Sequence, residues 1–413
     1  MNARSEREVL VVQAETLGAV AVIRSLGRAV YNVHACSTQA DALGLTSRFA
    51  AKGVVCPDYQ SASFLGWLRG YLKAHSISAI VPSESFLLAM RPCFDEFSHL
   101  LCGCQEEDAL YAGLSKFDLF STLMQTGAAG NHLPPALLIE DTSSLPGLSE
   151  LSRLPRPLYL KVDGSYAKQG DGGGVTKAES PEEAQAVLRA LATRFKKAVV
   201  QGFIPGRGVG AFFLLHRGEL LAEFMHLRLH EIPHTGGASS LRASWRHPSI
   251  RNDALTKLRC MRWEGVAMME YRWDPRSDEF HLLEMNGRFW GSLHLPLWAG
   301  VDFPRLLLDA FYGFAPRAIL DYPLGVRCRH TFPGELQYLW SRFKDSKLAL
   351  APKLWSVLEF LLLGANPKVH SDLFFPGDRA LYFRTLARTL RFTEAFIARG
   401  TRRRKDRNAL QQV

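Results

Sequence analysis

Several features that would point directly to a function are missing from this chain of 413 residues. No GxGxxG motif follows the first predicted strand, so a dinucleotide site is not expected there. No Gly-Lys-Ser or Gly-Lys-Thr follows the glycine-rich stretch near the middle of the chain, which excludes a Walker A loop. The sequence has no internal repeat and no low-complexity segment, so repeat architectures are not predicted.

Long hydrophobic runs are also missing. The longest run near the C-terminus, LWSVLEFLLLGA at 354–365, holds one Glu and is shorter than the ~20 residues of a membrane-spanning helix. The first residues, MNARSEREVLVVQ, carry charges up to Val9 and then read as a strand, so we expect no signal peptide. These patterns predict a soluble, cytoplasmic protein.

Cysteine is scarce, and its arrangement is not that of a disulfide framework. Seven cysteines, an odd number, are scattered over a long chain, as is typical of a reducing compartment. Cys102 and Cys104 form a CxC pair, but no second pair stands at the spacing of a zinc site. We therefore expect ordinary thiols.

Positive charge exceeds negative charge, and the excess is uneven. Much of the formal net charge of +10 lies in RGTRRRKDR, residues 399–407. A solvated end of the chain is the simpler interpretation, and weak contact with an anionic membrane is the alternative. No specific nucleic-acid partner is predicted.

The pattern divides a chain too long for one simple core into four parts. Residues 1–112 alternate apolar strands with amphipathic helices, which predicts a parallel α/β sheet because parallel strands need helical crossovers. Residues 113–200 carry a helix that contains Lys116, then a strand, a glycine-rich stretch and a second helix. Residues 201–330 are rich in strands, and residues 331–413 read as helical.

The glycine-rich stretch KQGDGGGV, residues 168–175, is a candidate phosphate-binding loop. Glycine has no Cβ, so backbone N–H groups of such a loop can approach an anion closely. Lys161, at the end of the preceding strand, could pair with phosphate. A plain flexible hairpin would read the same way. The candidate glycines are Gly170, Gly172, Gly173 and Gly174.

A second basic segment is MHLRLHEIPH, residues 225–234. As a strand it would turn its Met and two Leu side chains toward the core and leave three basic side chains on the other face: His226, Arg228 and His230. A solvated strand and an anion-binding surface both fit. A three-histidine metal site with His234 is disfavoured, because the intervening proline interrupts the helical spacing that such a site needs.

Two carboxylates, Glu270 and Glu284, lie on neighbouring predicted strands. The segment between them, RWDPRSDE, reads as a hairpin turn, so the strands should pair in antiparallel fashion. Alternation along the second strand puts Asn286 on the same face as Glu284. Two carboxylates and an amide suit magnesium, and salt bridges to Arg272 and Arg288 are the competing interpretation.

LLEMNGRFWGS, residues 282–292, resembles the metal-binding strand of the ATP-grasp superfamily. This family includes biotin carboxylase, the large chain of carbamoyl-phosphate synthase and D-alanine ligases. LSKFDLF resembles the segment that supplies a first nucleotide-contacting lysine, Lys116, and LYLKVDG resembles the strand whose lysine, Lys161, contacts phosphates. The glycine-rich stretch after it resembles the flap that closes over them. The resemblance covers about residues 9–309.

The stretch VVQGFIPGRG resembles the hinge that holds adenine, usually through backbone groups. The positions that match are Gln201, Gly202, Phe203 and Ile204. Many relatives carry an acidic residue where this chain has Gln201 and Gly202, so the resemblance does not define a ribose contact.

The resemblance implies an N-terminal parallel α/β lobe, two α+β ATP-grasp subdomains and a helical C-terminal extension. It implies ATP and Mg²⁺ as cofactors, with Mn²⁺ as an alternative metal, and a small-molecule carboxylate and an amine as substrates. The carboxylate would attack the γ-phosphate of ATP, and the amine would then displace phosphate from the acyl phosphate. The implied metal ligands are Glu270, Glu284 and Asn286, and the implied catalytic residues are Arg288, Lys161 and Arg228.

Three other functions remain open from the sequence. The first is an ATP-binding module without turnover, although the presence of both Glu270 and Glu284 argues against it. The second is a peripheral protein attached to an anionic membrane surface through residues 354–365 and the basic tail, since one apolar and one cationic signal together can anchor a protein. The third is a kinase that releases its phosphorylated product.

Overall fold

The structure is a computed structural model and describes residues 3–127, 130, 132–168 and 172–391. The basic tail and Gly170 lie outside the described residues. The chain forms two compact units, of which the first comprises Met1–Arg228 and Ala243–Val326 and the second Leu229–Arg242 and Arg327–Val413. In the part of the chain that is described, no helix is both long and apolar enough to cross a membrane.

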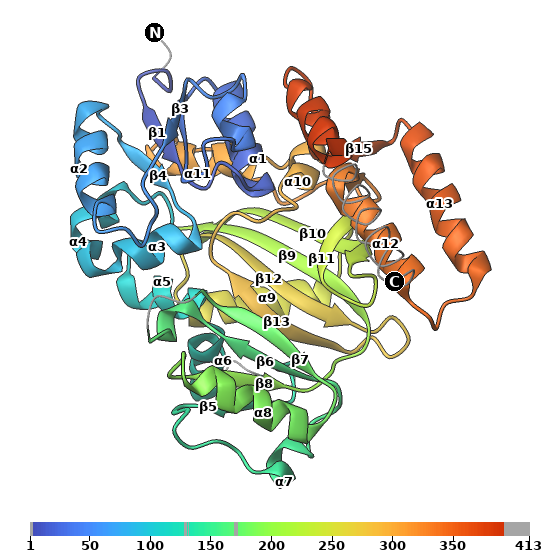
Figure 1. The fold of residues 1–413 in the computed structure, drawn as a ribbon. Coiled ribbons are helices and arrows are strands. Elements are labelled where there is room, and N and C mark those ends of the chain that lie inside the picture. The colour runs from blue at the N-terminus through green and yellow to red at the C-terminus, as the bar shows by residue number, and fades with distance from the viewer. Residues whose placement is uncertain (1–2, 128–129, 131, 169–171, 392–413) are drawn as a thin grey trace, which may run out of the picture. The chain divides into compact units, whose positions relative to one another are not determined.

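The first unit begins with a four-stranded parallel sheet (Figure 1). Its strand order is β3-β2-β1-β4, with bounds β1 Glu8–Val11, β2 Asn32–Ser37, β3 Lys52–Val55 and β4 Ala79–Val81. The accompanying helices are α1 Leu17–Arg28, α2 Phe64–Ala74, α3 Glu84–Met90, α4 Phe94–Phe97 and α5 Glu107–Leu114. The side chains of Thr16 and Ser83 cap α1 and α3 by accepting hydrogen bonds from backbone N–H groups in the first turn of each helix. Each cap lies in the loop that follows a strand. The predicted parallel α/β arrangement is confirmed.

A second sheet of the first unit is entirely antiparallel. Its order is β5-β8-β6-β7, with bounds β5 Ala136–Ile139, β6 Leu158–Val162, β7 Gly174–Ala178 and β8 Ala198–Gln201. The helices of this region are α6 Lys116–Gln125, α7 Leu148–Leu151 and α8 Pro181–Ala192. Leu158, Leu160 and Val162 of β6 are buried among apolar side chains from α8 and β8. This burial fixes the strand that carries Lys161.

The third group of strands in the first unit runs β13-β12-β9-β10. The bounds are β9 Arg207–His216, β10 Glu219–Ile232, β12 Gly265–Trp273 and β13 Phe280–Asn286. The associated helices are α9 Pro248–Cys260, α10 His294–Trp298 and α11 Phe303–Phe311. All three strand pairs are antiparallel, and the predicted β12–β13 hairpin is confirmed. Strand β10 extends past Arg228 into the second unit.

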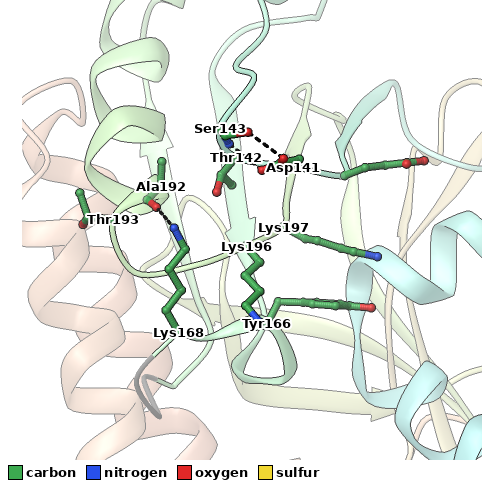
Figure 2. Close-up of a pocket in the computed structure, with 10 residues that line it drawn as sticks. Asp141, Thr142, Ser143, Tyr166, Lys168, Ala192, Thr193, Lys196 and Lys197 are labelled. Carbon is green, nitrogen blue, oxygen red and sulfur yellow. Dashed lines mark hydrogen bonds between the residues drawn. The ribbon is translucent and has the colours of Figure 1, made fainter.

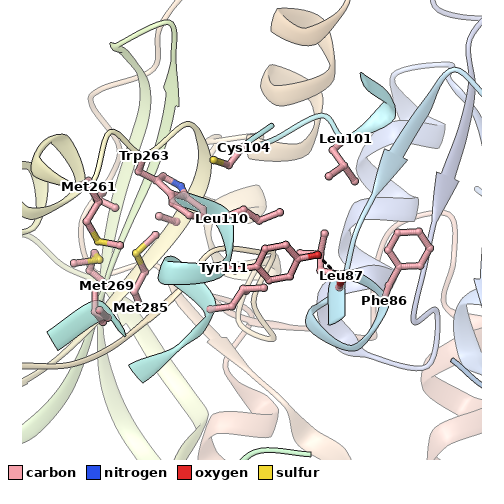
Figure 3. Packing of buried hydrophobic residues seen from close by; sticks show 14 of the residues in the cluster. Phe86, Leu87, Leu101, Cys104, Leu110, Tyr111, Met261, Trp263, Met269 and Met285 are labelled. Atoms are coloured by element: carbon pink, nitrogen blue, oxygen red, sulfur yellow. Dashed lines mark hydrogen bonds between the residues drawn. The ribbon is translucent and has the colours of Figure 1, made fainter. Parts of the chain in front are cut away.

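A large apolar core connects the N-terminal helices with the β12–β13 hairpin (Figure 3). Trp263 lies between Gly113 of α5 and Gly287 directly after β13, and a Cβ at either glycine would come within 2.5 Å of the indole ring. Met269 and Met285 pack beside it. The end of β13 is therefore held by close contact with a buried ring.

The described part of the second unit contains short strands and helices. Its elements are most of β11 Ala238–Ser244, then β14 Arg327–Arg329, β15 Val369–Ser371, α12 Leu336–Lys344 and α13 Leu350–Ala365, and residues 380–391 are also helical. Strands β14 and β15 pair in parallel. Arg242 and Asp372, both fully buried, form an ion pair in this unit.

Candidate active site

Lys161 lies on β6 with its ammonium group held by two oxygen atoms. Its Nζ donates to Gln201 Oε1 at 2.6 Å and to the Leu283 carbonyl at 3.2 Å. Gln201 ends β8, the strand beside β6, and Leu283 lies on β13 next to Glu284. Lys161 therefore connects the antiparallel β5–β8 sheet with the hairpin that carries the predicted metal ligands.

Lys116, the first residue of α6, lies between two carboxylates. Its Nζ is 3.4 Å from Glu284 Oε2 and 3.7 Å from Asp163 Oδ1. Asp163 follows β6 and also accepts hydrogen bonds from the Ser115 hydroxyl and the Phe117 N–H, each at 3.2 Å. The carboxylate of Asp163 thus fixes the start of α6 and, with it, the position of Lys116.

The two predicted metal-binding carboxylates are direct cross-strand partners. Glu270 of β12 stands opposite Glu284 of β13 in the antiparallel register. Glu270 Oε2 is 2.5 Å from Arg228 Nη2, and Asn286 Nδ2 donates to Glu284 Oε1 at 3.1 Å. The structure therefore brings together the predicted trio and three cationic side chains, two of them lysines.

The charges in this cluster shift one another's protonation. Burial lowers the pKa of Lys161 to about 8, although Glu284 and Glu270 act to raise it. Burial also acts to lower the pKa of Lys116, but the charges of Glu284 and Asp163 outweigh it and raise the pKa above its ordinary value. Burial acts to raise the pKa of Glu284, yet Lys116 and Lys161 bring it down to about 2. At neutral pH the carboxylate of Glu284 is ionised.

Arg288 lies beside a cavity of about 500 Å³ in the first unit. Its Nη2 is 3.8 Å from Glu84 Oε2, at the start of α3, and its Nη1 donates to the Phe289 carbonyl at 3.1 Å. The cavity is lined by the ends of β1 and β4, by residues that follow them and by two glycines of the predicted flap. Its lining includes Ser83, Glu84, Gly172, Gly173 and Arg288. The Arg288 guanidinium and the Glu84 carboxylate thus line the same cavity.

The predicted glycine-rich flap is only partly described. Gly172 and Gly173 line the cavity beside Arg288, and Gly174 begins β7. A Cβ at Gly173 would lie 2.8 Å from the Val162 carbonyl, so only glycine fits there without a backbone shift. The close approach places this part of the flap over the end of β6.

The predicted adenine hinge has a fixed backbone. The Gly202 N–H donates to the Pro135 carbonyl and the Phe203 N–H to the Pro155 carbonyl, each at 2.8 Å. Ile204 is buried, whereas Phe203 is 39% exposed. The backbone role assigned to this segment stays a prediction, while the side chain of Gln201 has a second role as the partner of Lys161.

The predicted basic face of β10 is buried in the structure, whereas a solvated face was one of the two expectations. His226 and Arg228 are buried, whereas Leu227, which alternation along the strand turns toward the core, is partly exposed. His226 packs edge-to-face on Phe212, and Arg228 is held by Glu270. Met225 is buried in the apolar core and Leu227 packs against it, so the expected inward face is confirmed. The solvated-strand interpretation is wrong, because aromatic and charged partners on β9 and β12 bury the polar side chains as well.

A second cavity, of about 590 Å³, lies in the region of the β5–β8 sheet and holds none of the predicted site residues (Figure 2). Three lysines line it, Lys168, Lys196 and Lys197, and the side chains of two of them contact other groups of the protein. Lys168 Nζ donates to the Ala192 carbonyl at 2.6 Å, and Lys197 lies over the rings of Phe117 and Tyr166. The side chains predicted to bind nucleotide and metal therefore lie around Glu284, and none of them lines this cavity.

Two residues of the cluster were missed by sequence reasoning. Asp163 follows Lys161 in LYLKVDG, where an Asp before a Gly reads as an ordinary turn. The feature that could have identified it is its position, two residues after Lys161 at the end of a buried strand. Glu84 follows Ser83 and reads as an acidic residue in the first turn of a helix, where it needs no further role.

The residues present fit a magnesium ion. In the described ranges, no group of three or more His, Cys, Asp or Glu side chains is arranged as a metal site. The predicted donor set is of another kind, two carboxylates and one amide, and Glu270, Glu284 and Asn286 do lie together. Magnesium accepts such a partial set of hard oxygen ligands because it keeps waters and shares phosphate oxygens.

Gly287 offers a test of how the end of β13 is held. A Cβ there would lie 2.4 Å from Trp263 Cη2, and the indole is buried with its N–H donating to the Val266 carbonyl at 3.1 Å. We expect Gly287→Ala to reduce the free energy of unfolding by about 1 to 3 kcal/mol, the usual cost of overpacking. Thermal unfolding followed by circular dichroism measures the change. Gly291→Ala, with no atom within 4 Å of its Cβ, is the control, and equal midpoints for the two variants would contradict the assigned packing.

Neither a protein-family model nor a curated protein sequence matches the chain. Solved structures do match its fold. An L-amino acid ligase from Bacillus licheniformis has 14% identity, with 74% of each chain covered and a TM-score of 0.54. Biotin carboxylase from Campylobacter jejuni, solved with β,γ-ATP, has 14% identity, covers 78% of this chain and 74% of its own, and has a TM-score of 0.57.

A third match is the biotin carboxylase domain of 2-oxoglutarate carboxylase from Hydrogenobacter thermophilus, solved with MgADP, ADP and bicarbonate. It has 16% identity, covers 78% of this chain and 73% of its own, and has a TM-score of 0.58. At such identities the likeness establishes the fold, and the predicted resemblance is confirmed at that level. The chain therefore has the ATP-grasp fold that its sequence motifs predict.

Proposed function

We propose that the protein is an ATP-dependent ligase that activates a carboxylate as an acyl phosphate and joins it to an amine or another nucleophile. The observation that carries the proposal is the cluster in which Lys116, Lys161 and Arg228 are balanced by Asp163, Glu270 and Glu284. The solved neighbours bound to β,γ-ATP and MgADP support the same nucleotide for this chain.

The cluster suits a polyphosphate and a cation that bind together. Lys116 is paired with Glu284, and Arg228 with Glu270. A nucleotide phosphate can replace the carboxylates as the partner of the cations, while a divalent ion replaces the cations as the partner of the carboxylates. Both sets of charges stay paired in either state, which avoids the cost of an unpaired buried charge. The pairing of these buried charges therefore supports a nucleotide site.

A magnesium ion held by Glu270, Glu284 and the oxygen of Asn286 would neutralise charge on the phosphates. The chain's own residues would position the reactants. Lys161 and Lys116 would hold the phosphates, and Gly172 and Gly173 would approach them with backbone N–H groups. Any adenine contact at the hinge would come from groups other than the Gly202 and Phe203 N–H groups, which are bonded to proline carbonyls.

The cavity beside Arg288 is the proposed site of the carboxylate substrate. Arg288 can bind the carboxylate through its guanidinium, and Glu84 can bind an ammonium group, since both side chains line the cavity and their charged groups lie 3.8 Å apart. A substrate with both groups, such as an α-amino acid, would satisfy both side chains at once. The neighbour that is an L-amino acid ligase fits this substrate class.

The reaction would proceed in two displacements. A carboxylate oxygen of the substrate attacks the γ-phosphorus of ATP, and the bond to ADP breaks, which gives an acyl phosphate. The amine then attacks the acyl carbon, and inorganic phosphate leaves with the bonding electrons. Arg288, at the cavity and next to the trio, would stabilise the charge of the transferring phosphoryl group, and Arg228 would pair with a phosphate oxygen in place of Glu270.

A screen for ADP release over pairs of carboxylates and amines tests the proposal, with mass detection of the product. We expect ADP and a condensed product only when ATP, an amino acid with a free carboxylate and an amine are all present. A phosphorylated product without condensation would indicate a kinase instead. Nucleotide binding without ADP release from any pair would indicate an ATP-binding module without turnover, and either result would contradict the ligase.

A further inference from the structure

Helix α13 of the second unit turns large apolar side chains toward solvent. Six of them are 46–66% exposed: Leu350, Leu354, Trp355, Leu358, Leu361 and Leu362. At 3.6 residues per turn they fall within an arc of about 140° on one side of the helix. The opposite side carries the buried residues Ser356 and Leu363. The more apolar side of the helix is thus the one that faces away from the unit.

Helix α12 extends this exposed surface. Trp340 is 56% exposed and Phe343 is 42% exposed. The two helices are joined by hydrogen bonds from Lys353 Nζ to the Phe343 carbonyl at 3.1 Å and from Arg342 Nη2 to the Pro352 carbonyl at 3.4 Å. We call the eight exposed apolar residues of α12 and α13 the α12–α13 face. Large exposed apolar side chains gathered on two neighbouring helices mark a site of interaction.

The length of α13 limits what the face can contact. Its 16 residues extend about 24 Å at 1.5 Å per residue, less than the ~30 Å of a bilayer's hydrocarbon core. A helix of this length with Trp and Leu on one side can lie in the plane of a membrane interface with its apolar side inserted. The geometry therefore fits lateral insertion into one leaflet.

Charge around the face distinguishes a membrane from other occupants. Among the described residues of this unit, positions 336–391 contain nine Lys and Arg but four Asp and Glu, so positive charge is in excess there. Lys344 and Lys347 are exposed near the face, and Lys344 Nζ lies 5.0 Å from the centre of the Trp340 ring. A second copy of the chain would bring like charges together, whereas anionic lipid would be attracted.

We propose that the α12–α13 face docks on an anionic lipid bilayer, with its Leu and Trp side chains inserted below the headgroups and the surrounding lysines against the lipid phosphates. An apolar signal and a cationic signal are both needed for stable attachment to a surface, and this unit supplies both. The proposal is independent of the ligase reaction, because it uses no residue of the candidate active site.

Co-sedimentation of the full chain with phosphatidylcholine vesicles, with and without phosphatidylserine, tests the proposal at low and high salt. We expect binding to the anionic vesicles, weakened by salt. Leu361→Glu should reduce the partition coefficient by about tenfold or more, because it removes one inserted Leu and places a charge at the apolar boundary. Leu324→Glu is the matched control, since Leu324 of the first unit is 60% exposed, as is Leu361.

Three results would overturn the proposal. The first is no binding to anionic vesicles, and the second is equal binding by the Leu361→Glu and Leu324→Glu variants. The third is a dimer in light scattering that Leu361→Glu dissociates while vesicle binding is absent, which would assign the face to a second copy of the chain. Because both leucines are exposed, each variant should keep the thermal unfolding midpoint of the unsubstituted protein, and this measurement shows that a loss of binding is not a loss of fold.

Discussion

Glu284→Gln is expected to reduce ADP release by about a hundredfold or more, the usual effect of removing one group that stabilises charge in a transition state. The substitution keeps the size of the side chain but removes its charge. Glu284 is the partner of Lys116 at 3.4 Å and a carboxylate of the proposed magnesium set. Its loss would leave both lysines without their nearest negative charge and would weaken the binding of the metal. The measurement is ADP formation with the carboxylate and amine pair identified by the screen.

Glu279→Gln is the matched control for this prediction. Glu279 is exposed in the turn of the same β12–β13 hairpin, so the same chemical change occurs away from the charge cluster. We expect the control to keep ADP release. Circular dichroism of both variants separates a lost reaction from a lost fold. ADP release by the folded Glu284→Gln protein at the rate of the control would remove Glu284 from the active site.

The parts of the site that the sequence predicted are those set by strand geometry. The turn residues in RWDPRSDE and the alternation along the second strand define an antiparallel hairpin, and the register does pair Glu270 with Glu284. Lys161 was singled out for a related reason, since it stands at the end of a buried strand and directly before the glycine-rich stretch, where an ammonium group could pair with phosphate. Local pattern is sufficient when one strand and its neighbour fix the position of a side chain.

The parts that the sequence did not predict depend on contacts between distant segments. Asp163 is the partner of Lys116 because α6 starts beside the end of β6, and Gln201 accepts from Lys161 because β8 lies next to β6. Glu84 reaches Arg288 across more than 200 positions of sequence. A single sequence carries no signal for such pairs, because each residue alone has an ordinary local interpretation.

The same limit applies to α13. Its sequence is apolar nearly all round, so hydrophobic periodicity did not indicate which side packs on the protein. The structure resolves this, since Ser356 and Leu363 face inward while Trp355 and Leu361 are exposed. Only the packing of the second unit distinguishes the inward side of α13 from its exposed side.

Lys161→Met is expected to weaken ATP binding by about 1.5 to 3 kcal/mol, the range for hydrogen bonds to charged groups, which corresponds to roughly ten- to hundredfold in Kd. Met keeps most of the volume of the buried side chain, so the change mainly removes the ammonium group. Lys177→Met, on the neighbouring strand β7 with an exposed side chain, is the control. Calorimetric titration that finds equal affinities for the two variants would remove Lys161 from the phosphate site.

The pH dependence of binding gives a second, more specific test of Lys161. Burial lowers the pKa of Lys161 to about 8, so its ammonium group is charged at neutral pH and loses its proton as the pH rises above that value. A bound phosphate favours the charged form and raises the pKa, so ATP binding should take up a proton above pH about 8 and should weaken by up to tenfold for each further pH unit. The pKa of Lys116 is raised, which leaves that lysine charged over the same range. The decline should therefore vanish in Lys161→Met and persist in Lys177→Met, whereas a decline of equal slope in both variants would assign it to another group.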